Sequence, residues 1–216
     1  MRYFTSDTHF GHRNILAYCD RPYLDVDNMN ADLVDRAAAK LADGGELWHL
    51  GDVALGNLDS TLAHLGRIPA DVTLVAGNHD RCHPCNGARS ARFVDIYRER
   101  CRLANLVLTS TTTTLSTGLT VTVCHFPYAD PAATGLEDRH GRIIKDQFAA
   151  WRAPNNGAWL LCGHVHGSWR QRGRMINVGV DAWGGDPVSE AKIIDIIEAG
   201  PTDRPPLPWA PHAVRS

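Results

Sequence analysis

The 216-residue sequence contains no run of 18 apolar residues, so we expect no membrane-spanning helix. Its N-terminal residues lack the long apolar stretch of a secretory signal, and we therefore expect a cytoplasmic protein without a cleaved leader. The formal net charge of −2 leaves no basic excess, which argues against an extensive nucleic-acid-binding surface but not against a small basic patch. The sequence also shows no internal repeat and no sign of a second domain.

The six cysteines form no recognisable disulfide or zinc framework. Without a secretory signal we expect reduced thiols. Cys124 and Cys162 fall inside apolar, strand-like runs, which predicts small buried side chains. Cys82 and Cys85 form a Cys-x-x-Cys pair that could bind a metal or act as a redox couple. A structural zinc site needs a second pair of ligands at a suitable spacing, however, and the chain offers no obvious one.

The first half of the chain alternates between apolar runs and stretches with helical spacing. Between Val34 and Leu41 apolar residues recur at helical spacing, with Asp27 or Asn28 as the expected cap, and residues 58–65 predict a shorter helix. Three apolar runs predict strands, and they are residues 2–6, 46–52 and 72–78. This alternation is typical of βαβ units in a largely parallel sheet.

The second half is richer in threonine, valine and leucine. Residues 107–115 and 119–124 flank a Ser-Thr-Gly turn and predict a hairpin. Further strands are predicted at 158–162, 175–178 and 191–197. The expected fold class is therefore α/β, with two packed mixed β-sheets flanked by helices.

The C-terminal residues beyond Gly200 are rich in proline and cannot form a helix or a strand ladder. We therefore expect one domain over residues 1–199. Residues 200–216 would form a tail that is either extended along the surface or disordered.

Five polar clusters follow the apolar runs in a fixed order: Asp7-Thr8-His9, Gly51-Asp52, Gly77-Asn78-His79-Asp80, His125 and Gly163-His164-Val165-His166. Ligands gather at the carboxyl ends of strands in open α/β sheets, so we expect these clusters to converge. Together they supply enough acid, amide and imidazole groups for two metal ions about 3.5–4 Å apart, an arrangement used for in-line attack on phosphate esters.

In this order the clusters resemble those of the calcineurin-like metallophosphoesterases. The run from Ser6 to Ile15, followed by Tyr18-Cys19-Asp20-Arg21-Pro22, is similar to a subgroup of small bacterial and phage-encoded members. The resemblance extends from Tyr3 to about Val180 without a substitution at a ligand position. It implies a four-layer sandwich fold.

The resemblance also implies a set of metal ligands. Asp7, His9, Asp52 and His166 would hold a first divalent ion, and Asp52, Asn78, His125 and His164 a second, so that Asp52 bridges the two ions. A shared carboxylate screens the repulsion between two close cations. The mixed ligand set suits manganese, iron or zinc better than magnesium, and manganese is our first choice.

His79 would not bind metal but would face the leaving group of the substrate, with Asn78 also reaching the substrate. Asp80 has two interpretations, as a residue that orients His79 or as a turn or helix cap. His12 and Arg13 follow the first ligand pair and could grip the substrate. The remaining histidines match no cluster, so we expect surface or loop positions for His49, His64, His140 and His212.

The implied activity is that of a dinuclear metal-dependent phosphodiesterase, which would act on small nucleotide-like phosphodiesters, cyclic nucleotides among them, or on aryl phosphodiesters, by in-line attack of a hydroxide held between the ions. The alternatives are a phosphomonoesterase, a single-strand nuclease, or a metal-binding scaffold without catalysis. The expected partner is a small phosphoester, and the sequence leaves the oligomeric state open. Residues 127–147 carry no readable motif and could form a specificity loop or a lid.

Overall fold

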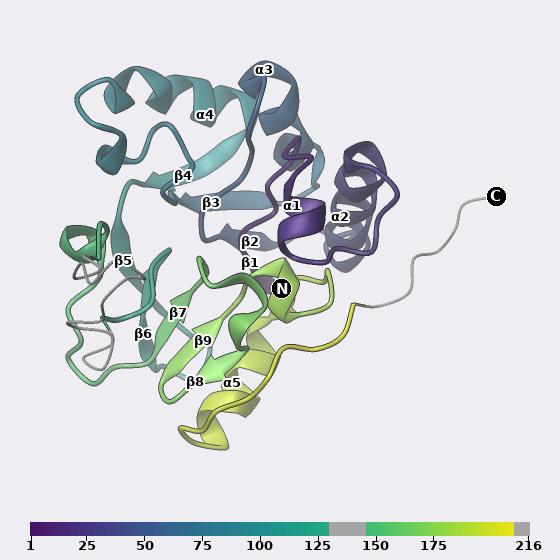
Figure 1. Ribbon diagram of the computed structural model, residues 1–216. Helices are drawn as coiled ribbons and strands as arrows, with labels where there is room; N and C mark the ends of the chain where they lie inside the picture. Colours follow the sequence, from purple (N-terminus) through teal and green to yellow (C-terminus); the bar gives the residue numbers. More distant parts are fainter. Residues whose placement is uncertain (130–145, 210–216) are drawn as a thin grey trace, which may run out of the picture.

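The computed structural model describes residues 1–129 and 146–209, which form two five-stranded sheets packed face to face (Figure 1). The first sheet has the order β10-β1-β2-β3-β4, with β10 antiparallel to β1 and the other neighbours parallel. The second has the order β5-β6-β7-β9-β8, with a parallel centre and an antiparallel neighbour at each edge. The predicted fold of two mixed sheets is confirmed.

The strands are short, and most were anticipated from the apolar runs. Their bounds are β1 Arg2–Thr5, β2 Glu46–His49, β3 Asp71–Val75, β4 Leu103–Val107, β5 Ser110–Thr114, β6 Thr120–Cys124, β7 Leu160–Cys162, β8 Gln171–Arg172, β9 Met175–Asn177 and β10 Val188–Ser189. The α-helices are α1 Ile15–Tyr18, α2 Val26–Lys40, α3 Leu58–Thr61, α4 Val94–Arg100 and α5 Glu190–Glu198. The predicted hairpin is present as β5 and β6, whereas β4 is a separate strand of the other sheet.

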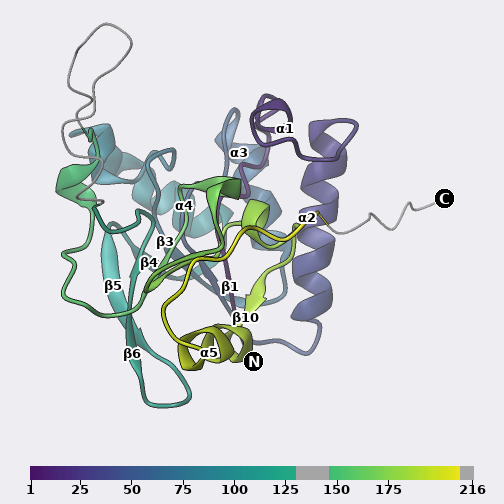
Figure 2. The same cartoon turned by 60° about the horizontal axis from the view of Figure 1, so that its bottom comes forward.

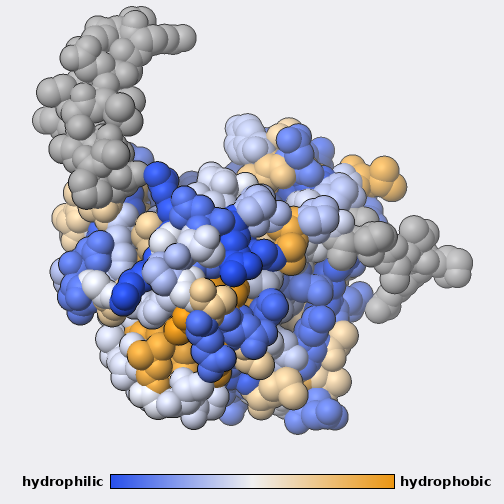
Figure 3. Space-filling model, turned by 90° about the horizontal axis from the view of Figure 1, so that it is seen from below, coloured by the Kyte–Doolittle hydropathy of each residue, from blue (hydrophilic) through white to orange (hydrophobic). Residues whose placement is uncertain are grey.

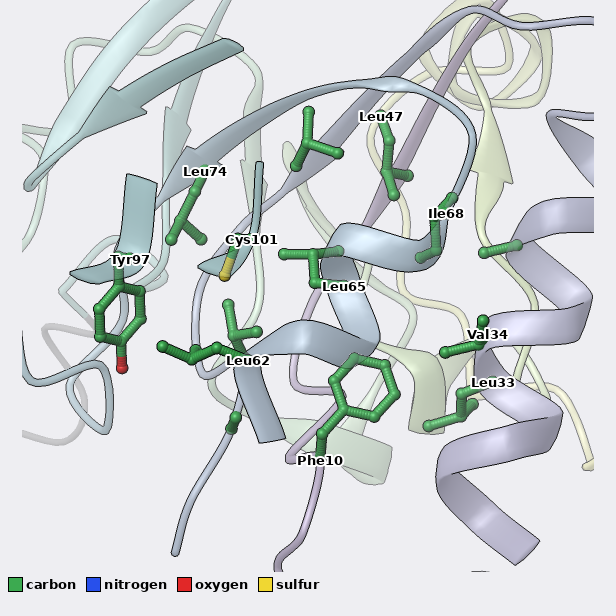
Figure 4. Packing of buried hydrophobic residues seen from close by; sticks show 14 of the residues in the cluster. Phe10, Leu33, Val34, Leu47, Leu62, Leu65, Ile68, Leu74, Tyr97 and Cys101 are labelled. Carbon is green, nitrogen blue, oxygen red and sulfur yellow. The ribbon is translucent and has the colours of Figure 1, made fainter. Parts of the chain in front are cut away.

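Side chains of the first sheet alternate between two apolar clusters. Leu47 and Leu74 point into a cluster that also contains residues of α2, α3 and α4, part of which is shown in Figure 4. Phe4 and Val75 point instead toward the second sheet and pack with residues such as Val123. In Figures 1 and 2, α2, α3 and α4 accordingly lie on one side of the first sheet and the second sheet on the other. This alternation is what a period of two residues in a strand dictates.

Two helix assignments differ from the sequence prediction. Helix α2 begins one residue after Asp25, whose side chain accepts a hydrogen bond from the Asn28 backbone N–H at 2.8 Å, so neither Asp27 nor Asn28 is the cap. The predicted strand at 191–197 is helix α5, capped by Ser189, whose hydroxyl accepts from the Lys192 N–H. Its isoleucines suggested a strand, but Ile193 and Ile196 are buried three residues apart, which is helical spacing.

The predicted helix at 58–65 is divided between α3 and a 3₁₀ helix, Leu62–Arg67. Among the described residues, the outer face of the second sheet is packed by a short 3₁₀ helix, Ala149–Trp151, and its neighbours. Phe148 and Trp151 lie there against the buried residues Leu160 and Cys162.

The described part of the proline-rich tail runs extended over the surface. Leu207 donates its backbone N–H to the Ala182 carbonyl at 3.0 Å, and Arg204 pairs with Gln171 in an isolated bridge. Trp209 meets Tyr23 edge to face at 5.6 Å. The extended alternative therefore holds as far as Trp209, and residues 210–216 lie outside the described part of the chain.

Within the described residues, no helix is long and apolar enough to cross a bilayer. Seen from below, the surface is mostly hydrophilic, with a hydrophobic patch at the lower left of the view and smaller ones elsewhere (Figure 3). The large exposed apolar side chains include Tyr18, Leu24 and Leu119.

Candidate metal centre

The five polar clusters all follow the carboxyl ends of strands. Asp7 and His9 come after β1, Asp52 after β2, Asn78 and His79 after β3, His125 after β6, and His164 and His166 after β7. These strands run through the centres of both sheets, so the two sheets present their ligand-type residues at a common edge. The convergence expected from the sequence is present.

The donor atoms form two groups of three. Asp7, His9 and His166 make the first group, and Asp52, His125 and His164 make the second; within each group the candidate atoms lie within 4.8 Å of one another. Asn78 belongs with the second group, because its Oδ1 lies 3.1 Å from His125 Nε2. The structure thus brings together all seven residues predicted as ligands, while metal binding by them remains a prediction.

Asp52 connects the two groups. Its Oδ2 lies 3.7 Å from His9 Nε2 in the first group and 3.4 Å from His125 Nε2 in the second. Its Oδ1 accepts a hydrogen bond from the His79 backbone N–H at 2.8 Å. A single carboxylate is therefore within reach of ligands of both groups.

The backbone at the ligands is strained. Seven non-glycine residues in the described ranges have positive φ, and five of them are candidate ligands: Asp7, His9, Asp52, His164 and His166. Their φ values lie between 46° and 71°, in a region that L-residues other than glycine rarely occupy. Strain of this kind clusters at functional sites, where the surrounding structure holds the residues in place.

Two glycines allow the ligand loops to approach each other closely. A Cβ atom on Gly77 would overlap Asp52 Oδ1, and one on Gly163 would overlap Ser6 Oγ and Asp7 Oδ2. Both positions need glycine for space rather than for a positive φ. The glycines of these motifs therefore have a structural reason to stand beside the ligands.

The first group has the chemistry that a metal ion requires. His9 is 1% exposed, yet neither of its ring nitrogens has a hydrogen-bond partner among the described residues. Burial lowers the pKa of His9 well below its ordinary value, so the ring is neutral and offers a lone pair. A buried, neutral and unpartnered imidazole beside two acids fits a divalent cation.

The second group shows strong electrostatic coupling. His125 Nδ1 lies 2.7 Å from the Leu50 carbonyl oxygen, which can only accept, so Nδ1 carries the hydrogen and Nε2 faces Asp52. Burial lowers the pKa of His125, but the Asp52 carboxylate outweighs it and raises the value to about 9. Burial lowers the pKa of His164 to about 4, aided by the neighbouring His125. The Asp52 carboxylate, with imidazoles around it, therefore gives this part of the site a strongly negative electrostatic potential.

A buried ion pair outside the predicted motifs supports the first group. The Arg21 guanidinium donates to both carboxylate oxygens of Asp181 at 2.8 Å and to the backbone carbonyl of Asp7 at 2.6 Å. Asp181 in turn lies 2.8 Å from His166 Nδ1. Burial lowers the pKa of His166, but the hydrogen bond to Asp181 raises it to about 11. This network fixes the orientation of the His166 ring.

The sequence prediction missed Asp181 altogether and gave Arg21 no role. Arg21 did lie in the quoted stretch from Tyr18 to Pro22, which was the available signal. Cys19 lies close enough to His166 and Asp181 to form a third group of possible ligands. Because Asp181 already binds Arg21 and His166, we do not assign a metal to that group.

Asp80 lies beneath the site and connects two ligand loops. Its carboxylate accepts backbone N–H groups from Asp52 at 2.8 Å, Val53 at 3.0 Å and Gly77 at 2.8 Å. Of its two predicted interpretations, the turn-fixing one agrees with this geometry. Burial and the Asp52 charge raise the pKa of Asp80 to about 7, against the opposing effect of the backbone hydrogen bonds.

The predicted substrate residues are placed unequally. His79 is exposed, and its ring centroid lies 5.4 Å from that of His9; His12 is partly buried and lies at the same distance from His9. Arg13 is exposed, and no hydrogen bond or ion pair joins its guanidinium to either group within residues 1–129 and 146–209. The structure therefore brings His79 and His12 to the site but gives no such support for Arg13.

The expectation for His49 was wrong. The residue is fully buried at the end of β2, and its Nε2 lies 2.9 Å from the Thr8 hydroxyl, below the first ligand pair. Burial lowers the pKa of His49 to about 3, which keeps it neutral. His64 is partly buried against Phe10, and His140 and His212 lie outside the described residues.

All six cysteines are free in the structure. Cys124 and Cys162 are fully buried, as predicted. Burial raises the pKa of the Cys82 and Cys85 thiols, and neither belongs to a group of possible metal ligands among the described residues. A metal or redox role for this pair gains no support.

The family follows from these features together with the comparisons. Residues 3–187 match the calcineurin-like phosphoesterase superfamily domain, and the chain belongs to this superfamily. Its members are hydrolases that typically bind two metal ions, in agreement with the two groups of histidine and aspartate ligands. The resemblance stated from the motifs is confirmed.

The similar proteins include two phage proteins of nearly the same length. The gene 66 protein of Mycobacterium phage L5 is 31% identical over 206 residues, covering 90% of this chain and 93% of the phage protein. The gene 66 protein of Mycobacterium phage D29 is 31% identical over 199 residues, covering 84% and 88%. A solved structure of a protein of unknown function from Aquifex aeolicus matches with a TM-score of 0.63 and 23% identity, covering 91% of this chain and 98% of that chain, and supports the fold.

Proposed function

We propose that the protein is a dinuclear metal-dependent phosphodiesterase that hydrolyses small nucleotide-like or aryl phosphodiesters. The observation that carries this proposal is the position of Asp52 between His9 and His125, which belong to different ligand groups. A carboxylate in that position can bind two ions at once. A site for a single ion would not need the second group.

The first ion would be held by Asp7, His9, Asp52 and His166, and the second by Asp52, Asn78, His125 and His164. When bound, the pair supplies Lewis acidity toward the phosphoryl oxygens and a nucleophilic water at neutral pH. The imidazole-rich set favours manganese, iron or zinc, and manganese remains our first choice.

His79 is our candidate for the proton donor to the leaving group. Its backbone N–H is held by Asp52 Oδ1, so the residue is fixed relative to the ligands while its side chain stays exposed. An imidazole can give a proton to the departing oxygen near neutral pH. His12, on the other side of His9, would contact the substrate without taking part in proton transfer.

An aromatic wall beside the second group supports an aryl or nucleoside substituent on the substrate. Phe148 stacks on Phe126 with ring centroids 4.9 Å apart, and its edge meets the His164 ring at 5.4 Å. Phe126 is 1% exposed, whereas Phe148 is only partly buried and retains accessible ring surface. A flat ring carried by a phosphodiester bound at His164 could pack on this surface.

The test is turnover by the full chain after removal of metal and reconstitution with Mn²⁺, Fe²⁺, Zn²⁺ or Mg²⁺ in turn. The substrates are bis(p-nitrophenyl) phosphate, p-nitrophenyl phosphate, and 2′,3′- and 3′,5′-cyclic nucleotides. We expect diester hydrolysis that needs a transition metal and a much slower reaction with the monoester. Faster monoester hydrolysis would replace the diesterase assignment by a phosphomonoesterase. Two bound ions without turnover of any substrate would favour the non-catalytic scaffold.

A further inference from the structure

A cluster of arginines follows the His79 loop. Six arginines and two acidic residues lie between Arg81 and Arg102, although the whole chain carries a net charge of −2. This segment leads from the end of β3, where Asn78 and His79 lie, to helix α4 (Figure 1). Positive charge is therefore concentrated in one stretch that begins at the candidate metal centre.

Two of these arginines share one aromatic ring. The guanidinium carbon of Arg81 lies 5.5 Å from the centroid of the Phe93 ring, and that of Arg92 lies 5.2 Å from the same centroid. Both arginines are exposed, and neither has a carboxylate partner within residues 1–129 and 146–209. Stacking on a ring holds a guanidinium in place while its N–H groups stay available to an anion.

The loop that carries these arginines is attached to the site by hydrogen bonds. The Arg81 backbone N–H donates to the Tyr97 hydroxyl at 3.1 Å. Farther along, the Asn86 amide donates to the backbone carbonyls of Asn78 at 3.2 Å and Asp80 at 3.0 Å. Arg81 thus lies two residues from His79 on a loop held by these bonds, while Arg92 lies in the 3₁₀ helix Ser90–Phe93 and shares the Phe93 ring with Arg81.

We propose that Arg81 and Arg92 bind backbone phosphates of a single-stranded nucleic acid whose scissile diester lies at the metal centre. This proposal rests on the phosphodiesterase chemistry of the proposed function and takes a single-stranded nucleic acid, the substrate of the single-strand nuclease alternative, as the substrate class. Two like charges held over one ring repel each other unless an anion lies between or beside them. A duplex would require a broad basic surface, which the net charge of −2 does not provide, whereas a single strand needs only a short basic track.

The experiment measures binding without hydrolysis, using the full chain in a chelating buffer and a fluorescein-labelled thymidylate strand of about 12 nucleotides. The variant is Arg81→Gln/Arg92→Gln. Its control is Arg67→Gln/Arg174→Gln, which removes the same charge from two exposed arginines that precede β3 and β9, at the opposite ends of those strands from the ligands. Arg81→Lys/Arg92→Lys keeps the charge and tests whether charge or guanidinium geometry matters.

We expect Arg81→Gln/Arg92→Gln to raise the Kd about tenfold and to reduce the slope of log K against log salt by roughly 1.4, the value for two lost single-strand contacts. The control pair should stay within about twofold of wild type, and the lysine pair should recover part of the affinity. Equal weakening of binding by both glutamine variants would mean that only the overall charge of the protein matters. Unchanged binding by Arg81→Gln/Arg92→Gln would mean that these arginines do not contact the strand. Either result overturns the proposal. Equally tight binding of a duplex of the same length would also overturn it.

Failure of this proposal can be told apart from failure of the proposed function. The binding experiment contains no metal and involves no turnover. Absence of diester hydrolysis by the metal-loaded wild type, on the small substrates named above, would contradict the phosphodiesterase activity while leaving the binding data intact.

Discussion

The two ligand groups are supported in different ways. In the first group, His166 is held by Asp181, which is held by Arg21, a side-chain network that lies mostly outside the ligand motifs. In the second group, His125 is held by the backbone carbonyl of Leu50, from the strand end that also carries Asp52. The first group can therefore be perturbed by mutating side chains that are not ligands. The second depends on a backbone group at a strand end, which a side-chain substitution does not remove.

Replacing Asp52 should have the largest effect on activity, because this residue lies within reach of both ligand groups and its loss would impair both. Asp52→Asn keeps the size of the side chain but loses the charge shared between His9 and His125. We expect diester hydrolysis to fall by roughly 10³-fold or more, the order seen when a charge-stabilising group is lost, together with lower content of both metals. Metal quantitation and kcat measure this, with Asn78→Ala as the milder comparison. Near-native turnover with both ions bound would contradict the bridging role.

His79 should come next, because it belongs to neither group and its effect should be on rate alone. His79→Ala should leave both ions bound and reduce the rate by about 10²–10⁴-fold, the usual contribution of a positioned proton donor. The loss should grow as the leaving group becomes more basic, which kcat/KM across a series of aryl and alkyl diesters would measure. An equal loss for all leaving groups would assign His79 to binding of the phosphate instead.

Asp181 tests the first group alone. Asp181→Asn should weaken metal binding at that group by about 10–100-fold, the usual cost of losing the partner of a ligand histidine, while the second group keeps its ion. Competition with a chelator, followed for each ion, measures the difference. Asp186→Asn is the matched control, since that residue makes only partly exposed ion pairs with Arg36 and Lys40. Equal loss from both groups would show that the network supports the whole site rather than His166.

Phe148 tests the second group and should have the smallest effect. Phe148→Leu should raise KM for bis(p-nitrophenyl) phosphate by about two- to tenfold, with little change in kcat, because a stacking contact is lost but an apolar surface remains. Methyl p-nitrophenyl phosphate has one aryl group fewer and should respond less. If KM rises equally for the two esters, the aromatic wall does not recognise the second ring.

The convergence of the polar clusters could be predicted from the sequence because each closes an apolar strand run, whereas the set of metal ligands was implied by the family resemblance. Asp52 and Asn78 follow glycines at strand ends, and strand ends of a parallel sheet meet at one edge. The second sheet was predicted from the hairpin near Gly118 and from the apolar runs that follow it. These features are local, so a single sequence contains them.

Other features depend on contacts between distant residues. Asp181 lies 160 positions from Arg21, and no local pattern indicates that they pair. The sequence around His49 does not show that this residue is buried in β2 next to Thr8. Helix α5 was mistaken for a strand because the β-branched isoleucines favour strands, whereas the Ser189 cap and packing against both sheets decide for a helix.

The left-handed backbone at five candidate ligands links the stability of the fold to its metals. Each such residue costs on the order of 1 kcal/mol relative to a relaxed conformation, and nothing in the metal-free chain returns that energy except the packing around it. Ions bound at the proposed centre would offset it, because they would bind the strained conformation and not the unfolded chain. Metal supply in the cell would then set how long each copy survives proteolysis as well as whether it turns over substrate, so that starvation for metal would remove the protein rather than store it in an idle form.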